Sequence, residues 1–205
     1  MSKERVISYI DGFNLYFGIK HKLPNSLLWI DVQKLTNNLL LPTQTLLHTN
    51  YFTSRISNNA PKQARQNTYL EALETLVDFN IFYGQYNYQD RTCKRCGDTY
   101  SHSSEKMTDV NIACQLLSDA FQDKFDTAFL ITGDSDLVPP IELIHTLFPN
   151  KRVFVAFPPN RQTNRLRQCS KGSLIIGRKK LSDSQFQDLV TKKDGFILRR
   201  PTTWI

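Results

Sequence analysis

Four aspartates stand where a folded chain could bring their carboxylates together. Asp11 ends a short apolar run, and Asp134 and Asp136 follow a second one. Asp109 falls on an apolar helical stripe, where burying an unpaired carboxylate would be costly. Three alternatives without a metal stay open: a turn at Asp11, an N-cap at Asp136, or an ion pair between Lys106 and Asp109. We favour a shared cation, because it accounts for the acid on the stripe.

Carboxylates gathered at one edge of a sheet would repel one another unless cations neutralised them. Ligand sets made only of oxygen atoms select magnesium or manganese over zinc. Such ions activate water and clamp a phosphodiester during in-line displacement. The four aspartates therefore indicate a Mg²⁺ or Mn²⁺ site that acts on a polyanion.

A second candidate metal site is the C-x-x-C-G motif at residues 93–97. The spacing of Cys93 and Cys96 is that of half a zinc site, and no second C-x-x-C is present. His102 could supply a third ligand. The fourth could come from a partner chain or from this chain, at Cys114, Cys169 or His48. A pair of inert or redox-active thiols on a loop is an equally good explanation.

Basic residues are concentrated in the last third of the chain. Residues 1–142 carry a net charge of −3, residues 143–205 carry +10, and no acid lies between 143 and 182. Such a surface attracts phosphates, although it could also be a solvated face without a ligand. Arg161, Arg165 and Arg167 follow a predicted strand, so we expect them on the same rim as the aspartates.

The elements that would position these residues alternate along the chain. Short apolar runs predict strands at residues 5–10, 46–53, 79–83, 128–132, 151–157 and 174–176. Helical spacing predicts helices at residues 29–41, 61–77, 105–121, 136–147 and 181–190. This alternation predicts an α/β fold with a mostly parallel sheet and helices on both faces. The ligand site of such a sheet lies at the carboxyl ends of its strands.

The length of 205 residues fits a single domain. We expect a core at residues 1–160 with a Cys-containing insertion at about 85–104, and a basic C-terminal extension at 161–205 packed on the same domain. No signal peptide or membrane-spanning run is visible, which predicts a cytoplasmic protein without a membrane partner. Motifs for nucleotide hydrolysis, dinucleotide binding, serine hydrolysis and zinc proteolysis are absent.

Three motifs resemble those of the NYN domain, a member of the PIN-like nuclease group. YIDGFNL at residues 9–15 matches the first family motif, EKMTDV at 105–110 is similar to the K-x-x-D motif, and ITGDSDL at 131–137 matches S/T-G-D-S-D. Their order and spacing agree from residue 5 to about residue 160. The chain most resembles the bacterial LabA-like branch.

The resemblance implies a three-layer α/β/α sandwich and metal-dependent cleavage of RNA. The acidic site that it implies consists of Asp11, Asp109, Asp134 and Asp136. Asn14 would be a supporting polar residue near the metals, and Thr132 would orient a neighbouring carboxylate. Lys106, the basic residue of the second motif, joins the three arginines as a candidate RNA contact. One departure is Gln115, which stands where members of the group often have a further acid.

The sequence thus predicts a ribonuclease that cleaves phosphodiester bonds with water activated by a divalent metal. Its partner would be single-stranded or structured RNA, and a homo-oligomer is compatible with the sequence. The alternative is a non-catalytic RNA-binding or adaptor protein on the same fold. A phosphatase of the haloacid dehalogenase type is excluded, because its second aspartate would fall where Phe13 stands. A toxin or antiphage effector would be a biological role for the same nuclease chemistry.

Overall fold

The computed structural model describes residues 3–57 and 59–205, and within these ranges six strands form the central sheet. Their order is β3-β2-β1-β6-β7-β8, and every neighbouring pair is parallel. The strands are β1 (Glu4–Asp11), β2 (Gln44–Thr53), β3 (Phe79–Tyr83), β6 (Thr127–Ile131), β7 (Arg152–Phe157) and β8 (Gly172–Ile175). The predicted parallel sheet is confirmed.

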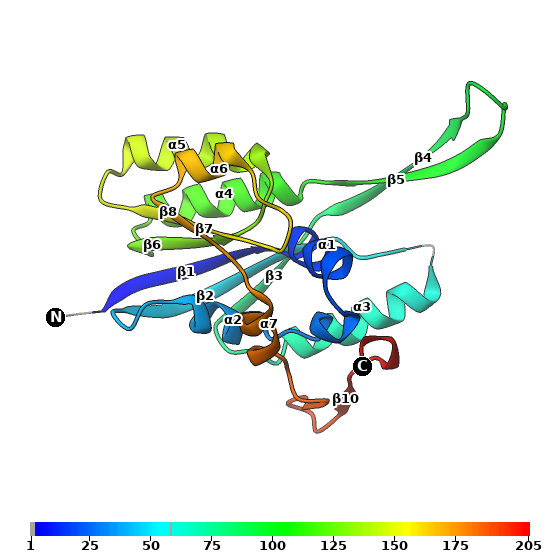
Figure 1. The fold of residues 1–205 in the computed structure, drawn as a ribbon, viewed down its shortest axis with the longest axis horizontal. Helices are drawn as coiled ribbons and strands as arrows, with labels where there is room; N and C mark the ends of the chain where they lie inside the picture. The colour runs from blue at the N-terminus through cyan, green and yellow to red at the C-terminus, as the bar shows by residue number, and fades with distance from the viewer. Residues whose placement is uncertain (1–2, 58) are drawn as a thin grey trace.

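Helices cover both faces of the sheet and make the three-layer sandwich (Figure 1). One face carries α1 (Gly12–Lys22), α2 (Val32–Leu39), α3 (Ala60–Leu73) and α7 (Arg178–Asp183). The other carries α4 (Thr108–Phe121), α5 (Val138–Leu147) and α6 (Asn164–Cys169). Each face buries its own apolar cluster, because both sides of the central strands are hydrophobic. The described residues contain no helix long and apolar enough to cross a membrane.

The order of the strands reverses between β1 and β6, which are neighbours in the sheet. All residues of β6 are buried, as are the last six of β1. The chain therefore leaves these two strands at adjacent points of the same sheet edge. This is the switch point at which open α/β sheets bind their ligands.

Two antiparallel hairpins are added to the sandwich. The predicted insertion forms β4 (Gln85–Thr92) and β5 (Thr99–Lys106), which project away from the body (Figure 1). Near the C-terminus, β9 (Leu189–Thr191) pairs with β10 (Ile197–Arg199). The 3₁₀ helices are η1 (Asn25–Leu28), η2 (Ser135–Leu137) and η3 (Thr202–Trp204). Trp204 of η3 packs in the core against Trp29 and Tyr69, which fixes the C-terminal segment on the α3 side.

Several predicted helix boundaries were wrong. The helix predicted at 105–121 begins at Thr108, because Glu105 and Lys106 pair with β4 as the end of β5. The helix predicted at 29–41 spans Val32–Leu39, since Asp31 caps its N-terminus. The helix predicted at 61–77 begins one residue earlier and ends at Leu73.

Helices α1, α6 and α7 differ more strongly from the predicted helices. The helix predicted at 181–190 is replaced by α7, which ends at Asp183, and by strand β9. Helices α1 and α6 were not predicted at all. In α1, Gly12, Gly18 and several aromatic residues weaken the intrinsic helix propensity, so the helix depends on its cap and its packing.

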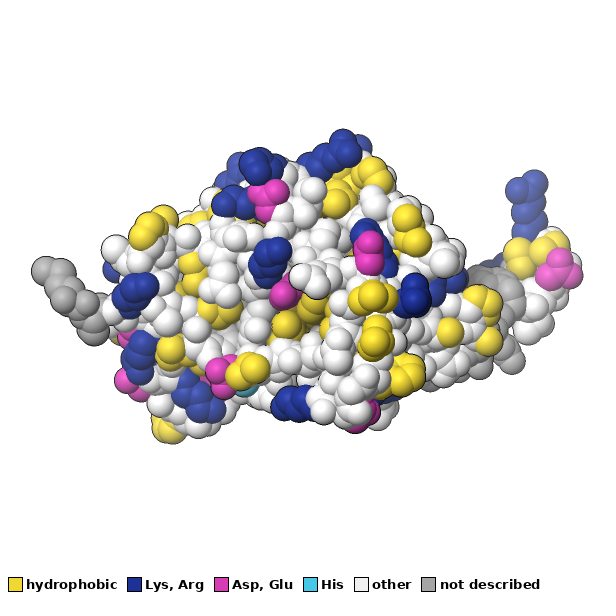
Figure 2. Space-filling view, turned by 90° about the horizontal axis from the view of Figure 1, so that it is seen from below, with side chains coloured by type: hydrophobic (Ala, Val, Ile, Leu, Met, Phe, Trp, Pro, Cys, Tyr) yellow, Lys and Arg dark blue, Asp and Glu magenta, His cyan; other side chains and the backbone are white. Residues whose placement is uncertain are grey.

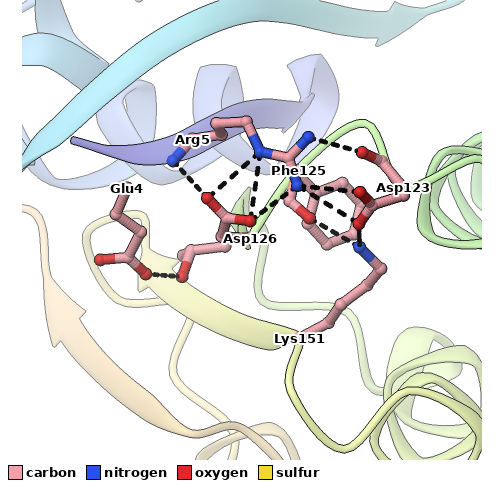
Figure 3. Close-up of polar contacts among 7 residues, drawn as sticks. Glu4, Arg5, Asp123, Phe125, Asp126 and Lys151 are labelled. Atoms are coloured by element: carbon pink, nitrogen blue, oxygen red, sulfur yellow. Dashed lines mark hydrogen bonds and ion pairs between the residues drawn. The ribbon is translucent and has the colours of Figure 1, made fainter. Parts of the chain in front are cut away.

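A polar cluster ties the opposite, N-terminal edge of the sheet together (Figure 3). Arg5 bonds Asp126 and Asp123, with its Nη2 2.7 Å from Asp126 Oδ1. The buried Lys151 donates to Asp123 Oδ1 at 2.7 Å and to the Phe125 carbonyl oxygen at 2.8 Å. Lys151 is the first residue of the strand predicted at 151–157 in the acid-free segment. Its ammonium group is bound at the N-terminal edge of the sheet and does not reach the C-terminal edge.

Candidate active site

Asp11 is the best-fixed acid at the C-terminal edge of the sheet. It ends β1, is 2% exposed and caps α1, with its Oδ1 accepting from the Asn14 backbone N at 2.9 Å. Its Oδ2 accepts from Asn14 Nδ2 at 2.6 Å and from Thr132 Oγ1 at 3.0 Å. Burial raises the pKa of Asp11, and the hydrogen bonds from Asn14 and Thr132 lower it by less, so that the pKa is raised overall. The three hydrogen bonds hold the Asp11 side chain in one orientation.

The loop after β6 is joined to the same network. The backbone N of Gly133 donates to Asn14 Oδ1 at 3.3 Å, and that of Asp134 donates to Thr132 Oγ1 at 3.1 Å. Asp134 Oδ1 accepts from the backbone N of Asp136 at 3.0 Å and so caps η2. Asn14 and Thr132 thus connect the first motif with the third.

Asp109 lies in the first turn of α4, half-buried and within the electrostatic reach of the other three aspartates. Burial and then the charges of Asp134, Asp11 and Asp136 raise its pKa from 3.8 to about 6. Lys106 is exposed, and none of the ion pairs among the described residues joins it to Asp109. The charges of the other three aspartates named from the sequence therefore act on Asp109 at this edge.

Glu105 is an acid that the sequence analysis did not assign to the site. Its Oε1 accepts hydrogen bonds from Ser54 Oγ at 3.1 Å and from Thr108 Oγ1. Burial and the charges of Asp11, Asp109 and Asp134 raise its pKa from 4.5 to about 7. Its position in the EKMTDV motif was the available signal. That signal was missed because Glu105 was placed on the helix and not on β5.

Gln115 is directed to a different group of residues. Its Nε2 donates to both oxygens of Asp119, at 2.9 and 3.0 Å. Asp119 is buried and also accepts from Tyr9 Oη at 2.8 Å and Lys124 Nζ at 2.9 Å. At the position where the resemblance led us to expect a further acid, Gln115 therefore binds Asp119, whose charge is paired with Lys124.

The acidic edge fits a hard divalent cation by its chemistry. Its donors are carboxylate oxygens, and burial together with their mutual repulsion raises the pKa values of Asp109 and Glu105. In the described part of the chain, no three His, Cys, Asp or Glu side chains already converge closely enough to hold an ion. A cation here would draw the acids together and remove their repulsion.

The three predicted arginines differ in their relation to this edge. A Cβ built on Gly133 would lie 1.9 Å from the Arg161 carbonyl oxygen, so Arg161 packs directly on the acidic loop. Arg165 lines a hollow together with Asp136 and Glu142. Arg167 lies in the last turn of α6 and is exposed, without a contact to the acids in the described structure. Arg161 and Arg165 are therefore the nearer candidates for a phosphate.

The Cys pair lies at the turn between β4 and β5. The Gly97 backbone N donates to the Cys93 carbonyl oxygen at 2.9 Å, and Gly97 has a φ of 76°, which closes the turn. Backbone N–H groups of Arg95 and Cys96 lower the pKa of the Cys93 thiol. The side chain of His102 lies outside the described residues. His48, Cys114 and Cys169 belong to β2, α4 and α6, so a zinc site here stays a prediction.

The family model that describes the NYN domain matches residues 5–175, which is most of the chain. This chain belongs to the NYN domain family. The match includes all three motifs and strand β8, and it agrees with the predicted PIN-like α/β sandwich.

Two proteins show how this NYN domain chain relates to others. The 6-hydroxy-3-succinoylpyridine 3-monooxygenase of Pseudomonas putida is 26% identical over 193 residues, covering 75% of this chain and 59% of that protein. The chain thus spans less than two thirds of this relative. A crystal structure of a Vibrio parahaemolyticus protein of unknown function has a TM-score of 0.57 at 20% identity. That match covers 90% of this chain and 98% of the other, and it shows the fold alone.

Proposed function

We propose that this NYN domain protein is a metal-dependent ribonuclease. The observation that carries the proposal is the acidic edge at the switch point, where Asp11 is fixed and Asp109 is affected by three other carboxylates. Asp11, Asp109, Asp134 and Asp136 would hold Mg²⁺ or Mn²⁺. When bound, such an ion supplies an activated water and neutralises charge that develops on the phosphate.

The residues around the four aspartates have two roles in this proposal: they orient a metal ligand or they bind phosphate. Asn14 and Thr132 orient the Asp11 carboxylate through three hydrogen bonds, which keeps a ligand oxygen directed to one place. Arg161 and Arg165 bind the phosphates of the strand, and such contacts position RNA without reading its sequence. Lys106, exposed at the end of β5, is a further candidate contact.

The test is a cleavage assay on defined RNA and DNA strands with Mg²⁺, Mn²⁺ or EDTA. Asp134→Asn keeps the side-chain oxygen that caps η2, so it removes charge while preserving the local fold. We expect it to lose cleavage, whereas Asp183→Asn, in an exposed ion pair on α7, behaves like the unmodified protein. Cleavage in EDTA, or full activity of Asp134→Asn, would contradict the proposal.

Two other functions are tested by the same preparations. The name of the Pseudomonas relative suggests hydroxylation of a pyridine ring, and the chain could be assayed with 6-hydroxy-3-succinoylpyridine. We rank a monooxygenase function second, because the sequence has no dinucleotide-binding motif. Such a function would also give the four aspartates of the acidic edge no role. An RNA-binding adaptor would bind the strands and leave them intact with either metal.

A further inference from the structure

A hollow of about 460 Å³ lies beside the acidic edge, between α1 and α3. Its volume is within the range of small-molecule sites. Its walls come from α1, α3, the segment around Thr53–Ser57, Tyr86 and Trp204. The nuclease proposal does not use this hollow.

Aromatic rings dominate the α1 side of the hollow. Phe17 is stacked with Phe13 at 6.2 Å between ring centroids, and Tyr16 meets Phe17 edge-on at 5.2 Å. Tyr86 of β4 meets Phe13 edge-on at 5.9 Å. Phe17 is half-buried and belongs to neither buried apolar cluster of the sandwich. Phe17 also contacts the His21 ring at 5.6 Å, and it lines the hollow, where a planar ligand could reach it.

The charge of the hollow has one sign. Lys20, Lys62 and Arg65 line it, and among the described lining residues none is Asp or Glu. None of these three cations forms an ion pair in the described part of the chain, although Lys20 lies 5.4 Å from the Tyr16 ring centroid. Figure 2 shows the molecule from below, where Lys and Arg side chains and a smaller number of Asp and Glu are spread among hydrophobic ones. The aromatic rings of α1 can stack on a nucleotide base, and the three cations, which have no acidic partner among the described residues, can bind its phosphate. The hollow therefore suits a nucleotide.

The hollow and the acidic edge share two strand ends. Gly12, in its wall, directly follows Asp11, and Thr53 directly precedes Ser54, which donates to Glu105. Gln66 braces this wall, with its Nε2 2.8 Å from the Ser54 carbonyl oxygen and its Oε1 2.7 Å from the Ile56 backbone N. A strand held at the acids could therefore place a neighbouring nucleotide in the hollow.

We propose that this hollow binds an unpaired base of a single-stranded RNA, stacked on Phe17, with adjacent phosphates at Lys62 and Arg65. The inference rests on the proposed ribonuclease function and adds a subsite for one base of the strand. Stacking on an aromatic ring accepts any base, so the hollow selects for strandedness and not for sequence. Bases in a duplex are already stacked and paired, and they would have to leave the helix to enter.

The experiment measures binding in EDTA, so that cleavage does not interfere. A short single-stranded RNA is compared with a strand of the same length that lacks its bases and with a blunt duplex. Phe17→Leu keeps an apolar side chain but removes the ring, and Phe121→Leu is the matched control, since Phe121 is 80% exposed on α4. Thermal unfolding verifies that both variants are folded.

We expect Phe17→Leu to weaken binding of the intact strand by about five- to a hundredfold, the range of a single base–aromatic stack. Binding of the abasic strand should be unaffected by this change, and the duplex should bind weakly to both proteins. Replacing Lys62 and Arg65 by Gln should flatten the salt dependence by about 0.7 in slope for each phosphate that is no longer bound. The double variant Lys193→Gln/Arg199→Gln removes the same charge from exposed positions of the C-terminal hairpin and is the control.

Equal affinity of Phe17→Leu and unmodified protein for the intact strand would overturn the base site. In that case, cleavage that still depends on Asp134 and on metal would leave the ribonuclease proposal intact. A protein that binds neither the intact strand nor the duplex in EDTA, and that cleaves neither of them with Mg²⁺ or Mn²⁺, would overturn both. Tight binding of the free aromatic acid nicotinate with no binding of RNA would also overturn the inference, because it would make the hollow a small-molecule site.

Discussion

Asp11 and Asp109 are both acids of the candidate site, but their surroundings differ. Asp11 accepts three hydrogen bonds, which offset part of the cost of its burial, although its pKa stays raised. Asp109 is half-buried beside three like charges, and its raised pKa reflects this uncompensated position. Hydrogen bonds thus hold the Asp11 carboxylate in one orientation for a ligand. At Asp109, a bound cation would relieve the electrostatic repulsion.

A residue-scale prediction concerns Thr132, which touches no ligand itself. Its hydroxyl donates to Asp11 and accepts from the Asp134 backbone N. Thr132→Val keeps the shape and removes both bonds, so we expect about ten- to a hundredfold slower cleavage. Metal titration should show weaker binding. Thr146→Val, which loses only a bond to a helix carbonyl on α5, should retain its activity; equal rates for both variants would contradict the orienting role.

The pKa values of Glu105 and Asp109 lead to a prediction on stability. The folded protein holds protons on these groups up to about pH 7 and about pH 6, whereas the unfolded chain releases them near the ordinary values of 4.5 and 3.8. The folded state thus binds more protons in this window, so the free energy of unfolding falls as pH rises through it. We expect the metal-free protein to melt at a higher temperature at about pH 5 than at about pH 8.

The double variant Glu105→Gln/Asp109→Asn provides the control for this pH dependence. It lacks both raised groups, so its melting temperature should change less over the same range and should exceed that of the unmodified protein at the alkaline end. Added Mg²⁺ should stabilise the unmodified protein more than the variant. Parallel pH curves for the two proteins would show that other groups control the dependence.

At the scale of elements, the loop after β6 is held by its contact with the chain that follows β7. Gly133→Ala would place a methyl group 1.9 Å from the Arg161 carbonyl oxygen, so one of the two loops must move. We expect a loss of about 1–3 kcal/mol in stability. Because Asp134 and Asp136 follow directly, cleavage should fall by about a hundredfold.

Gly177→Ala is the matched control for this substitution. A Cβ at Gly177 meets no atom within 4 Å, and the backbone φ of −78° suits alanine. Chemical unfolding and single-turnover cleavage of the two variants separate stability from activity. Near-normal cleavage by Gly133→Ala would mean that the loop tolerates displacement and that its contact with Arg161 has no role in the site.

The elements also show how far sequence patterns reach. β6 and β7 were predicted because continuous apolar strands are recognisable, and Asp11 and Asp134 were located because they follow such strands. α1 was missed because its stability comes from the Asp11 cap and from packing, which local propensity does not describe. Glu105 was missed because β5 continues through it, and strand pairing between distant residues has no local signal. The hollow beside α1 likewise depends on the packing of α1 against α3.

For the whole molecule, the position of the charges matters more than their sum. Lys151 and Arg5 are bound to acids at the N-terminal edge, so they contribute to the fold. Arg161 and Arg165, in contrast, adjoin the acidic loop at the C-terminal edge, where a strand would have to approach. A basic path that ends at the carboxylates would hold the phosphates on each side of the cleaved bond.

The last prediction tests this path as a whole. Replacing Arg161, Arg165 and Arg167 by alanine should weaken binding of single-stranded RNA and flatten its salt dependence by about 0.7 in slope for each phosphate released from the protein. Replacing Arg152, Lys193 and Arg199 removes the same charge from exposed positions that include the opposite edge. A long-range effect of net charge would weaken both variants equally, whereas direct contacts would affect only the first. An unchanged slope in the first variant would direct attention to the projecting β4–β5 hairpin, whose exposed Lys94 and Arg95 could then carry the strand to the acids.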